Sequence, residues 1–214
     1  MFKKTLAVAA LAMLSPLANA APFYADTVNS FAGGTGFGVY DQSGGSYLGA
    51  SGNGVYDPLA VTTLDGAALA LGGASGTAGQ IVISFGSGSF FDGAGADLRF
   101  FDTFGAAEGF VLDISADGTN FFSVGTFPGD FSFCFPGAPC ITDVDISGSA
   151  INSGSFLRIT AHQPTSVFNY PEAYDLDAVE ALNFTTTSVP EPGTILLLGL
   201  GLAGLGYSRR RTRA

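Results

Sequence analysis

Two carboxylates late in the chain have the spacing of a cation site. Asp175 and Asp177 are separated by one residue, and Glu180 follows them. Residues two apart on a strand point to the same side, so the two aspartates could share one ion. Hard oxygen ligands suit calcium, and Asp41 or Asp57 could complete the set if the last strand pairs near the N-terminal part. The pattern predicts a structural calcium site, with a solvated acidic strand end as the alternative.

A second acidic pair mimics the opening of an EF-hand calcium loop. Asp143 and Asp145 stand at the first and third positions, but the twelfth position is Gly154, where such a loop needs a bidentate glutamate. Val144 and Ile146 alternate with the aspartates. We therefore expect a half-buried strand here rather than a calcium loop.

The sequence contains no recognisable catalytic constellation. Its one histidine, His162, stands beside Gln163 and Pro164, no G-x-S-x-G motif is present, and neither cysteine has a base partner. Paired carboxylates could serve a glycosidase, yet some proximity is expected by chance among so many acids. We expect a protein that is not an enzyme, with a glycan hydrolase as the least favoured alternative.

The two cysteines of the chain, Cys134 and Cys140, enclose a Pro-Gly turn. In an oxidising compartment this spacing predicts a local disulfide. The loop is short, so the bond would add only about 2 kcal/mol of stability. A metal site would need further ligands nearby.

Five tyrosines lie in segments rich in glycine or proline, where they could stack on sugar rings. They are Tyr40, Tyr47, Tyr56, Tyr170 and Tyr174. The alternative is that they cap the hydrophobic core of the domain.

The first twenty residues have the features of a secretory signal peptide in the required order. A positively charged start precedes an apolar run at residues 6–14 that is too short to span a bilayer, and a small-x-small pattern ends at Ala20. We expect signal peptidase to cut between Ala20 and Ala21, which makes the chain an exported precursor.

The C-terminal end carries three ordered features. Pro190, Glu191 and Pro192 precede a glycine-rich apolar stretch at residues 194–207, and a cluster of four arginines follows it. The stretch is shorter than the roughly 20 residues of a comfortable spanning helix, and the arginines resist translocation. An exported chain would therefore stall with this tail transiently in the inner membrane.

This tail resembles the PEP-CTERM sorting signal, over about the last 26 residues. The resemblance implies recognition by an exosortase, a membrane enzyme that cleaves at the motif formed by Pro190, Glu191 and Pro192. Such systems are typical of Gram-negative bacteria that make exopolysaccharide and biofilm matrix. A permanent single-helix anchor remains the alternative. In both cases the body of the chain lies outside the cytoplasm.

The body between the two ends is strongly acidic. It holds 17 acidic residues against two basic ones, Arg99 and Arg158, for a formal charge of −15. Nucleic acids and anionic membrane surfaces would repel such a body, so nucleic-acid binding is excluded. Divalent cations, calcium above all outside a cell, would be attracted.

Apolar residues alternate at 80–85, 110–115 and 156–161, the period of half-buried strands. Asp117 and Gly118 form a turn between the second strand and an apolar segment at 121–124, which predicts a hairpin. No long helical periodicity appears between the two ends.

We therefore expect three parts. Residues 1–20 form the signal helix, residues 21–188 an all-β domain built as an antiparallel β-sandwich, and residues 189–214 the sorting tail with its hydrophobic helix.

From about residue 57 to residue 182, the order of motifs is similar to that of galactose-binding-domain-like jelly rolls. The matching segments are 95–101, 114–121, 156–160 and 174–182. The acidic residue expected just after the first segment is displaced to Asp102 or Glu108, and the loop between the cysteines resembles an insertion. This resemblance implies a fold, not a ligand.

These features predict a non-enzymatic cell-surface or extracellular matrix protein associated with exopolysaccharide and biofilm. Its expected partners are signal peptidase, an exosortase-type processing enzyme and exopolysaccharide. The alternative is a calcium-dependent carbohydrate-binding module, which binding to glycans in the presence of calcium would favour.

Overall fold

The computed structural model describes residues 22–41, 56–73, 76–102, 108–129, 139–162 and 174–186. Over these ranges the chain is all-β, with every strand pairing antiparallel, apart from one short 3-10 helix, η1 (Pro58–Val61). Within the same ranges, no helix has the length and apolar character needed to cross a membrane. The all-β prediction is therefore confirmed.

Three sheets make up the domain. The first has the order β10 (Cys140–Val144), β7 (Leu98–Asp102), β13 (Asp175–Ala181), β4 (Ala67–Ala70), β3 (Gly38–Asp41), with β1 (Phe23–Tyr24) also paired to β13. The second has the order β2 (Thr27–Ala32), β5 (Gln80–Ser84), β12 (Phe156–His162), β8 (Gly109–Ser115), β9 (Phe122–Phe127). The third joins β11 (Ser153–Gly154), β6 (Gly88–Phe91) and β14 (Phe184–Thr186).

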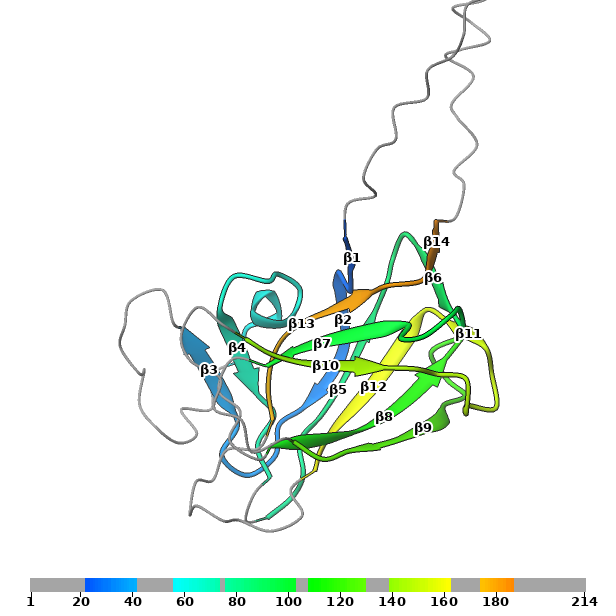
Figure 1. The fold of residues 1–214 in the computed structure, drawn as a ribbon. Helices are drawn as coiled ribbons and strands as arrows, with labels where there is room; N and C mark the ends of the chain where they lie inside the picture. The colour runs from blue at the N-terminus through cyan, green and yellow to red at the C-terminus, as the bar shows by residue number, and fades with distance from the viewer. Residues whose placement is uncertain are drawn as a thin grey trace, which may run out of the picture.

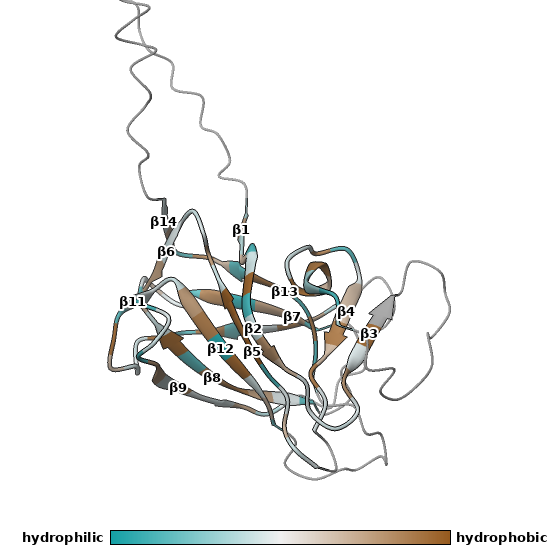
Figure 2. Ribbon diagram, turned by 180° about the vertical axis from the view of Figure 1, so that it is seen from behind, coloured by the Kyte–Doolittle hydropathy of each residue, from teal (hydrophilic) through white to brown (hydrophobic). Residues whose placement is uncertain are grey.

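The two larger sheets pack face to face as a sandwich. Figure 1 shows β10, β7 and β13 crossing in front of β5, β12 and β8, and Figure 2 shows the hydrophobic residues of these strands from behind. The ring of Phe100 on β7 lies 4.5 Å from that of Phe110 on β8, centroid to centroid, so the sheets meet directly. Each fully buried apolar side chain at this interface stabilises the fold by about 1.5–3 kcal/mol.

Period-two alternation explains which residues reach the core. The fully buried positions alternate along each central strand: Ile81 and Ile83, Leu98 and Phe100, Leu112 and Ile114, Leu157 and Ile159. The three strands predicted from this alternation correspond to β5, β8 and β12.

The predicted Asp-Gly hairpin connects β8 to β9. Asp117 Oδ1 accepts hydrogen bonds from the backbone N–H groups of Thr119 and Asn120, each at 2.8 Å. Gly118 has a φ of +73°, a left-handed conformation that glycine adopts without steric cost. The turn thus fixes the register in which β8 and β9 pair.

The segment that mimics an EF-hand forms the strand predicted in its place. Val144 ends β10, and both it and Ile146 are buried, whereas Asp143 and Asp145 are exposed.

The two ends of the described chain leave the sandwich at the same end, where β1 and β14 lie close together (Figure 1). The rings of Phe23 and Phe184 stack there at 4.4 Å. Residues 1–21 and 187–214 lie outside the described ranges, so the signal helix, the tail helix and the three domain boundaries stay predictions.

Candidate functional site

The predicted calcium ligands Asp175 and Asp177 are both buried on β13 but have separate surroundings. The β13–β7 register shifts between Leu176 and Ala178, so Asp177 occupies a bulge. A bulge interrupts the regular alternation on which the shared orientation of the two aspartates depended. Asp177 accepts hydrogen bonds from the backbone N–H groups of Asp65, at 3.4 Å, and Gly66, at 3.2 Å.

Asp175 belongs instead to an acidic group with Asp102 and Glu108, which we call the buried acidic group. One carboxylate oxygen from each residue lies within 4.8 Å of the others. Asp102 ends β7, Glu108 precedes β8 and Asp175 begins β13. Their exposed fractions are 6, 9 and 3%. The sequence resemblance marked Asp102 and Glu108 as alternatives, and the structure brings both to Asp175.

Tyr174 directly precedes Asp175 of this group in the chain. It is 2% exposed, and among the described residues its hydroxyl makes no hydrogen bond. Burial raises the pKa of Tyr174 well above its usual value, and the charges of Asp102, Glu108 and Asp175 raise it further. The hypothesis that Tyr174 stacks on a sugar at the surface is wrong, because its ring packs 4.6 Å from that of Phe110 in the core.

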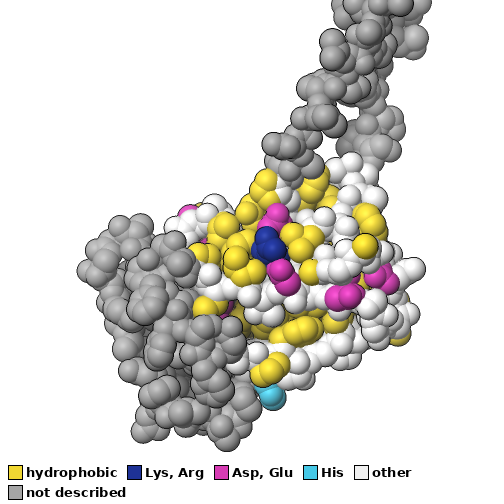
Figure 3. All heavy atoms as spheres, in the orientation of Figure 1, with side chains coloured by type: hydrophobic (Ala, Val, Ile, Leu, Met, Phe, Trp, Pro, Cys, Tyr) yellow, Lys and Arg dark blue, Asp and Glu magenta, His cyan; other side chains and the backbone are white. Residues whose placement is uncertain are grey.

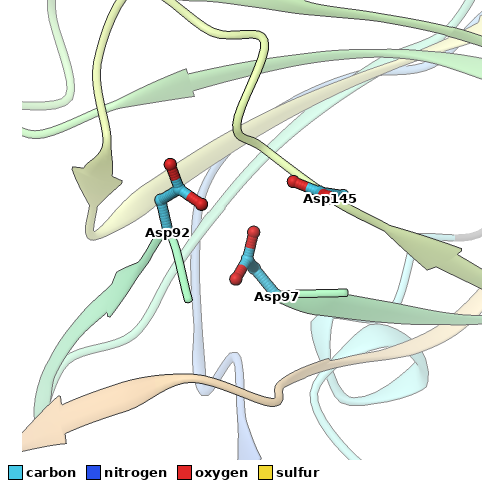
Figure 4. Close-up of side chains that lie close together, drawn as sticks. All are labelled: Asp92, Asp97 and Asp145. Atoms are coloured by element: carbon cyan, nitrogen blue, oxygen red, sulfur yellow. The ribbon is translucent and has the colours of Figure 1, made fainter. Parts of the chain in front are cut away.

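A second acidic group joins Asp92 and Asp97, at the two ends of the loop between β6 and β7, with Asp145, which follows β10, as Figure 4 shows. Asp97 is fully buried, and its carboxylate has clear structural partners. Oδ1 accepts from Gly93 N and from the side-chain amide of Asn183, each at 2.7 Å, and Oδ2 accepts from Ile146 N at 2.9 Å. Asp97 therefore ties three loops together.

The outer face of the first sheet carries a row of polar side chains across four strands, which we call the outer row. The register aligns Tyr24 on β1 with Glu180 on β13, Glu180 with Arg99 on β7, and Arg99 with Asp143 on β10. Figure 3 shows apolar side chains gathered around a basic side chain with acidic side chains beside it, and Ile141 is among the exposed apolar residues.

Charge pairing organises the outer row. Hydrogen bonds from the Arg99 guanidinium hold the pKa of Asp143 below its usual value. Burial and the charge of Glu180 raise the pKa of Tyr24. The row, with two carboxylates and one guanidinium, offers hydrogen-bond donors and acceptors beside apolar surface. Its members come from distant parts of the sequence, so sequence reasoning had no signal for it.

Of the remaining sugar-stacking candidates, two lie in the described part of the chain. Tyr56 is exposed, and its ring stacks on that of Phe31 at 4.7 Å. Tyr40 lies on β3, while Tyr47 and Tyr170 lie outside the described residues.

Other predicted residues have simple local positions. Asp57 caps η1 by accepting from Leu59 N at 2.9 Å, and it belongs to neither acidic group in the described part of the chain. His162 ends β12 opposite Gly109 on β8.

Several predicted site residues fall outside the described ranges. They are Ala20, Ala21, Cys134, Pro190, Glu191 and Pro192. Cys140 begins β10, and its pairing with Cys134 stays a prediction.

Comparison with solved structures gives distant likenesses. The C-terminal domain of a chitobiase from Bacteroides fragilis is 12% identical, with 76% of this chain and 95% of that one covered and a TM-score of 0.41. A chitosan-binding module of a chitosanase/glucanase from Paenibacillus sp. is 15% identical, with 70% and 95% covered and a TM-score of 0.40. An exo-beta-1,3-galactanase from Phanerochaete chrysosporium is 15% identical, with 74% and 27% covered and a TM-score of 0.25. All three TM-scores lie below 0.5, so these likenesses say nothing about what this chain binds.

The sequence comparisons are decisive at one end of the chain. No curated protein sequence matches this chain. Residues 188–211 match the PEP-CTERM protein-sorting motif, as the resemblance of the tail predicted. Pro190, Glu191 and Pro192 lie within the match, and the chain therefore carries the PEP-CTERM signal of an exported, cell-surface-sorted protein.

Proposed function

We propose that this chain is a non-enzymatic surface or matrix protein, delivered by its tail and associated with exopolysaccharide in a biofilm. The match of residues 188–211 to the sorting motif carries the proposal. An exosortase-type enzyme would recognise Pro190, Glu191 and Pro192 while the apolar stretch holds the chain transiently in the inner membrane. The body would then be a galactose-binding-like jelly roll presented at the cell surface.

The acidic body supports a structural role in the matrix. Seventeen acidic residues against two arginines would keep such a domain soluble in a hydrated matrix and would attract counterions such as calcium. The buried acidic group is too enclosed for a polymer chain to reach Asp102, Glu108 or Asp175, which favours a non-catalytic role.

Intact-mass spectrometry of the protein from its native host tests the sorting proposal. A mature chain that begins at Ala21 and ends near Val189 supports processing by signal peptidase and an exosortase. A chain that still contains Arg213 indicates a lasting anchor and contradicts release. Deleting residues 188–214 should also prevent surface delivery, and an unchanged destination would contradict the role of the tail.

The outer row favours a second candidate, a carbohydrate-binding module. Sugars combine apolar faces with hydroxyl groups, and the row places Tyr24 and the paired Arg99 beside exposed apolar side chains. Retention on the host's exopolysaccharide, with and without calcium chelator, tests this candidate. The double variant Tyr24→Ala, Arg99→Ala should lose retention.

Arg158→Ala is the matched control for this experiment. Arg158 lies on the opposite sheet, pairs with Asp113 at 2.9 Å and has nearly the same side-chain exposure as Arg99, 33% against 34%. Its loss should leave retention unchanged. Equal losses of retention in the double variant and in Arg158→Ala would indicate non-specific charge effects rather than a binding face.

A further inference from the structure

The buried acidic group poses an electrostatic problem. Three carboxylates that converge within 4.8 Å, each 9% exposed or less, repel one another in a medium that screens charge poorly. A proton shared within the group, or a bound cation, would relieve this repulsion.

The separation of the oxygens suits a calcium ion. Calcium binds oxygen ligands at about 2.3–2.6 Å, so oxygens up to about 4.6–5.2 Å apart can share one ion. The three oxygens of the group fall within that limit at 4.8 Å. Magnesium prefers shorter distances and keeps more of its waters, which fits three converging carboxylates less well.

Tyr174 provides an independent sign of a ligand. Its hydroxyl is buried, lies within the electrostatic influence of Asp102, Glu108 and Asp175, and makes no hydrogen bond among the described residues. A buried hydroxyl without a partner is unfavourable, because it has given up its hydrogen bonds to water. Three carboxylates do not complete the six to eight oxygens that calcium takes, and water supplies the rest. A water carried by the ion would give the Tyr174 hydroxyl its missing partner.

We propose that Asp102, Glu108 and Asp175 form a calcium site in the interior of the sandwich, with the Tyr174 hydroxyl bonded to the ion's water. The site ties the end of β7 and the start of β8 to the start of β13, and so joins the two large sheets. Asp177, which the sequence grouped with Asp175, has no part in it. The proposal is independent of sorting by the tail and of glycan binding by the outer row.

Thermal unfolding of the full chain tests the site. After treatment with EDTA, adding about 1 mM CaCl2 should raise the Tm by roughly 5 °C or more, because calcium binds only the folded state. Asp102→Asn, Glu108→Gln and Asp175→Asn should each abolish most of this rise. Each should also raise the Tm measured in EDTA, since one repelling charge is gone.

Two aspartate variants serve as matched controls. Asp177→Asn tests the pairing predicted from sequence, and Asp145→Asn tests the second acidic group. Both should keep the full response to calcium. No response in the wild type overturns the proposal, and so does a response that survives Asp175→Asn or disappears in Asp177→Asn. A rise in Tm without calcium in the Asn and Gln variants, with no calcium response in the wild type, would indicate shared protons instead.

Terbium luminescence gives a readout that does not depend on stability. Tb³⁺ takes the same oxygen ligands as Ca²⁺, and a nearby phenol sensitises its emission. The chain has no tryptophan, so tyrosine must be the sensitiser. Tyr174→Phe should remove most of the emission while the calcium-induced rise in Tm remains. Emission that persists in Tyr174→Phe, or that excess calcium does not reduce, would place the bound terbium elsewhere.

Discussion

Arg99 and Asp143 face each other across the β7–β10 ladder and form a bidentate ion pair. Arg99 Nε donates to Asp143 Oδ1 at 2.7 Å, and a terminal guanidinium nitrogen donates to Oδ2 at 2.9 Å. Both side chains remain partly exposed. The pair therefore fixes the geometry of the outer row more than it stabilises the fold.

Removing either partner of this pair should cost little stability. We expect Arg99→Ala and Asp143→Ala each to lower the free energy of unfolding by about 1 kcal/mol or less, with a coupling energy of about 0.2–1 kcal/mol in a double-mutant cycle. Urea unfolding at low and high salt measures this coupling, which should shrink at high salt. A coupling energy of several kcal/mol would contradict the description of Arg99 and Asp143 as a surface ion pair screened by solvent.

Replacing Asp97 should lower the free energy of unfolding far more. Asp97→Asn keeps the shape of the side chain but turns an amide donor toward a backbone N–H or the Asn183 amide, because both carboxylate oxygens already accept hydrogen bonds. We expect a loss of about 3 kcal/mol or more in the free energy of unfolding, measured by urea denaturation.

The exposed Asp145, from the same acidic group, is the control for Asp97. Asp145→Asn should change stability far less, since its carboxylate is in solvent. Similar effects of the two substitutions would show that Asp97 does not hold the three loops together.

Protonation of Asp177 should make the protein more stable in mild acid. Burial raises the pKa of Asp177 to about 6, despite the hydrogen bonds from Asp65 and Gly66 that lower it. The folded-state pKa lies above the unfolded value, so this group's contribution is most favourable below the unfolded pKa and is lost as the pH rises through 6. The contribution at about pH 4 should exceed that at pH 7 by on the order of 3 kcal/mol.

Comparison with Asp177→Asn isolates this effect. The variant cannot titrate, so the difference in unfolding free energy between wild type and variant should change between about pH 4 and pH 7 by the amount given above. Urea unfolding in calcium-free buffer measures it, so that cation binding does not enter the comparison. A difference that stays constant with pH would contradict a raised pKa for Asp177.

The glycine at the β8–β9 turn should be hard to replace. Gly118→Ala puts a Cβ at a φ of +73° and 3.0 Å from the ring of Phe156, so we expect a loss of about 1–2 kcal/mol or more. Gly95 has a similar φ with open space around it, and Gly148 also has open space. In thermal unfolding the loss should follow the order Gly118, Gly95, Gly148, and a different order would contradict the steric argument.

Local patterns in the sequence were sufficient for the strands and for the sorting tail. The alternation in β5, β8 and β12 and the Asp117-Gly118 turn depend on neighbours along the chain, which the sequence lists directly. The motif at residues 188–211 is contiguous and acts through its own composition, so it too could be recognised without a fold.

Only the tertiary structure decided which acids lie together. One bulge at Asp177 separated it from Asp175, and the packing of β7, β8 and β13 brought Asp102 and Glu108 to Asp175 from positions about 70 residues away. The same packing aligned the outer row and buried Tyr174. Spacing along a strand fixes orientation only while the strand is regular, whereas proximity between strands depends on register and sheet order, which a single sequence does not display.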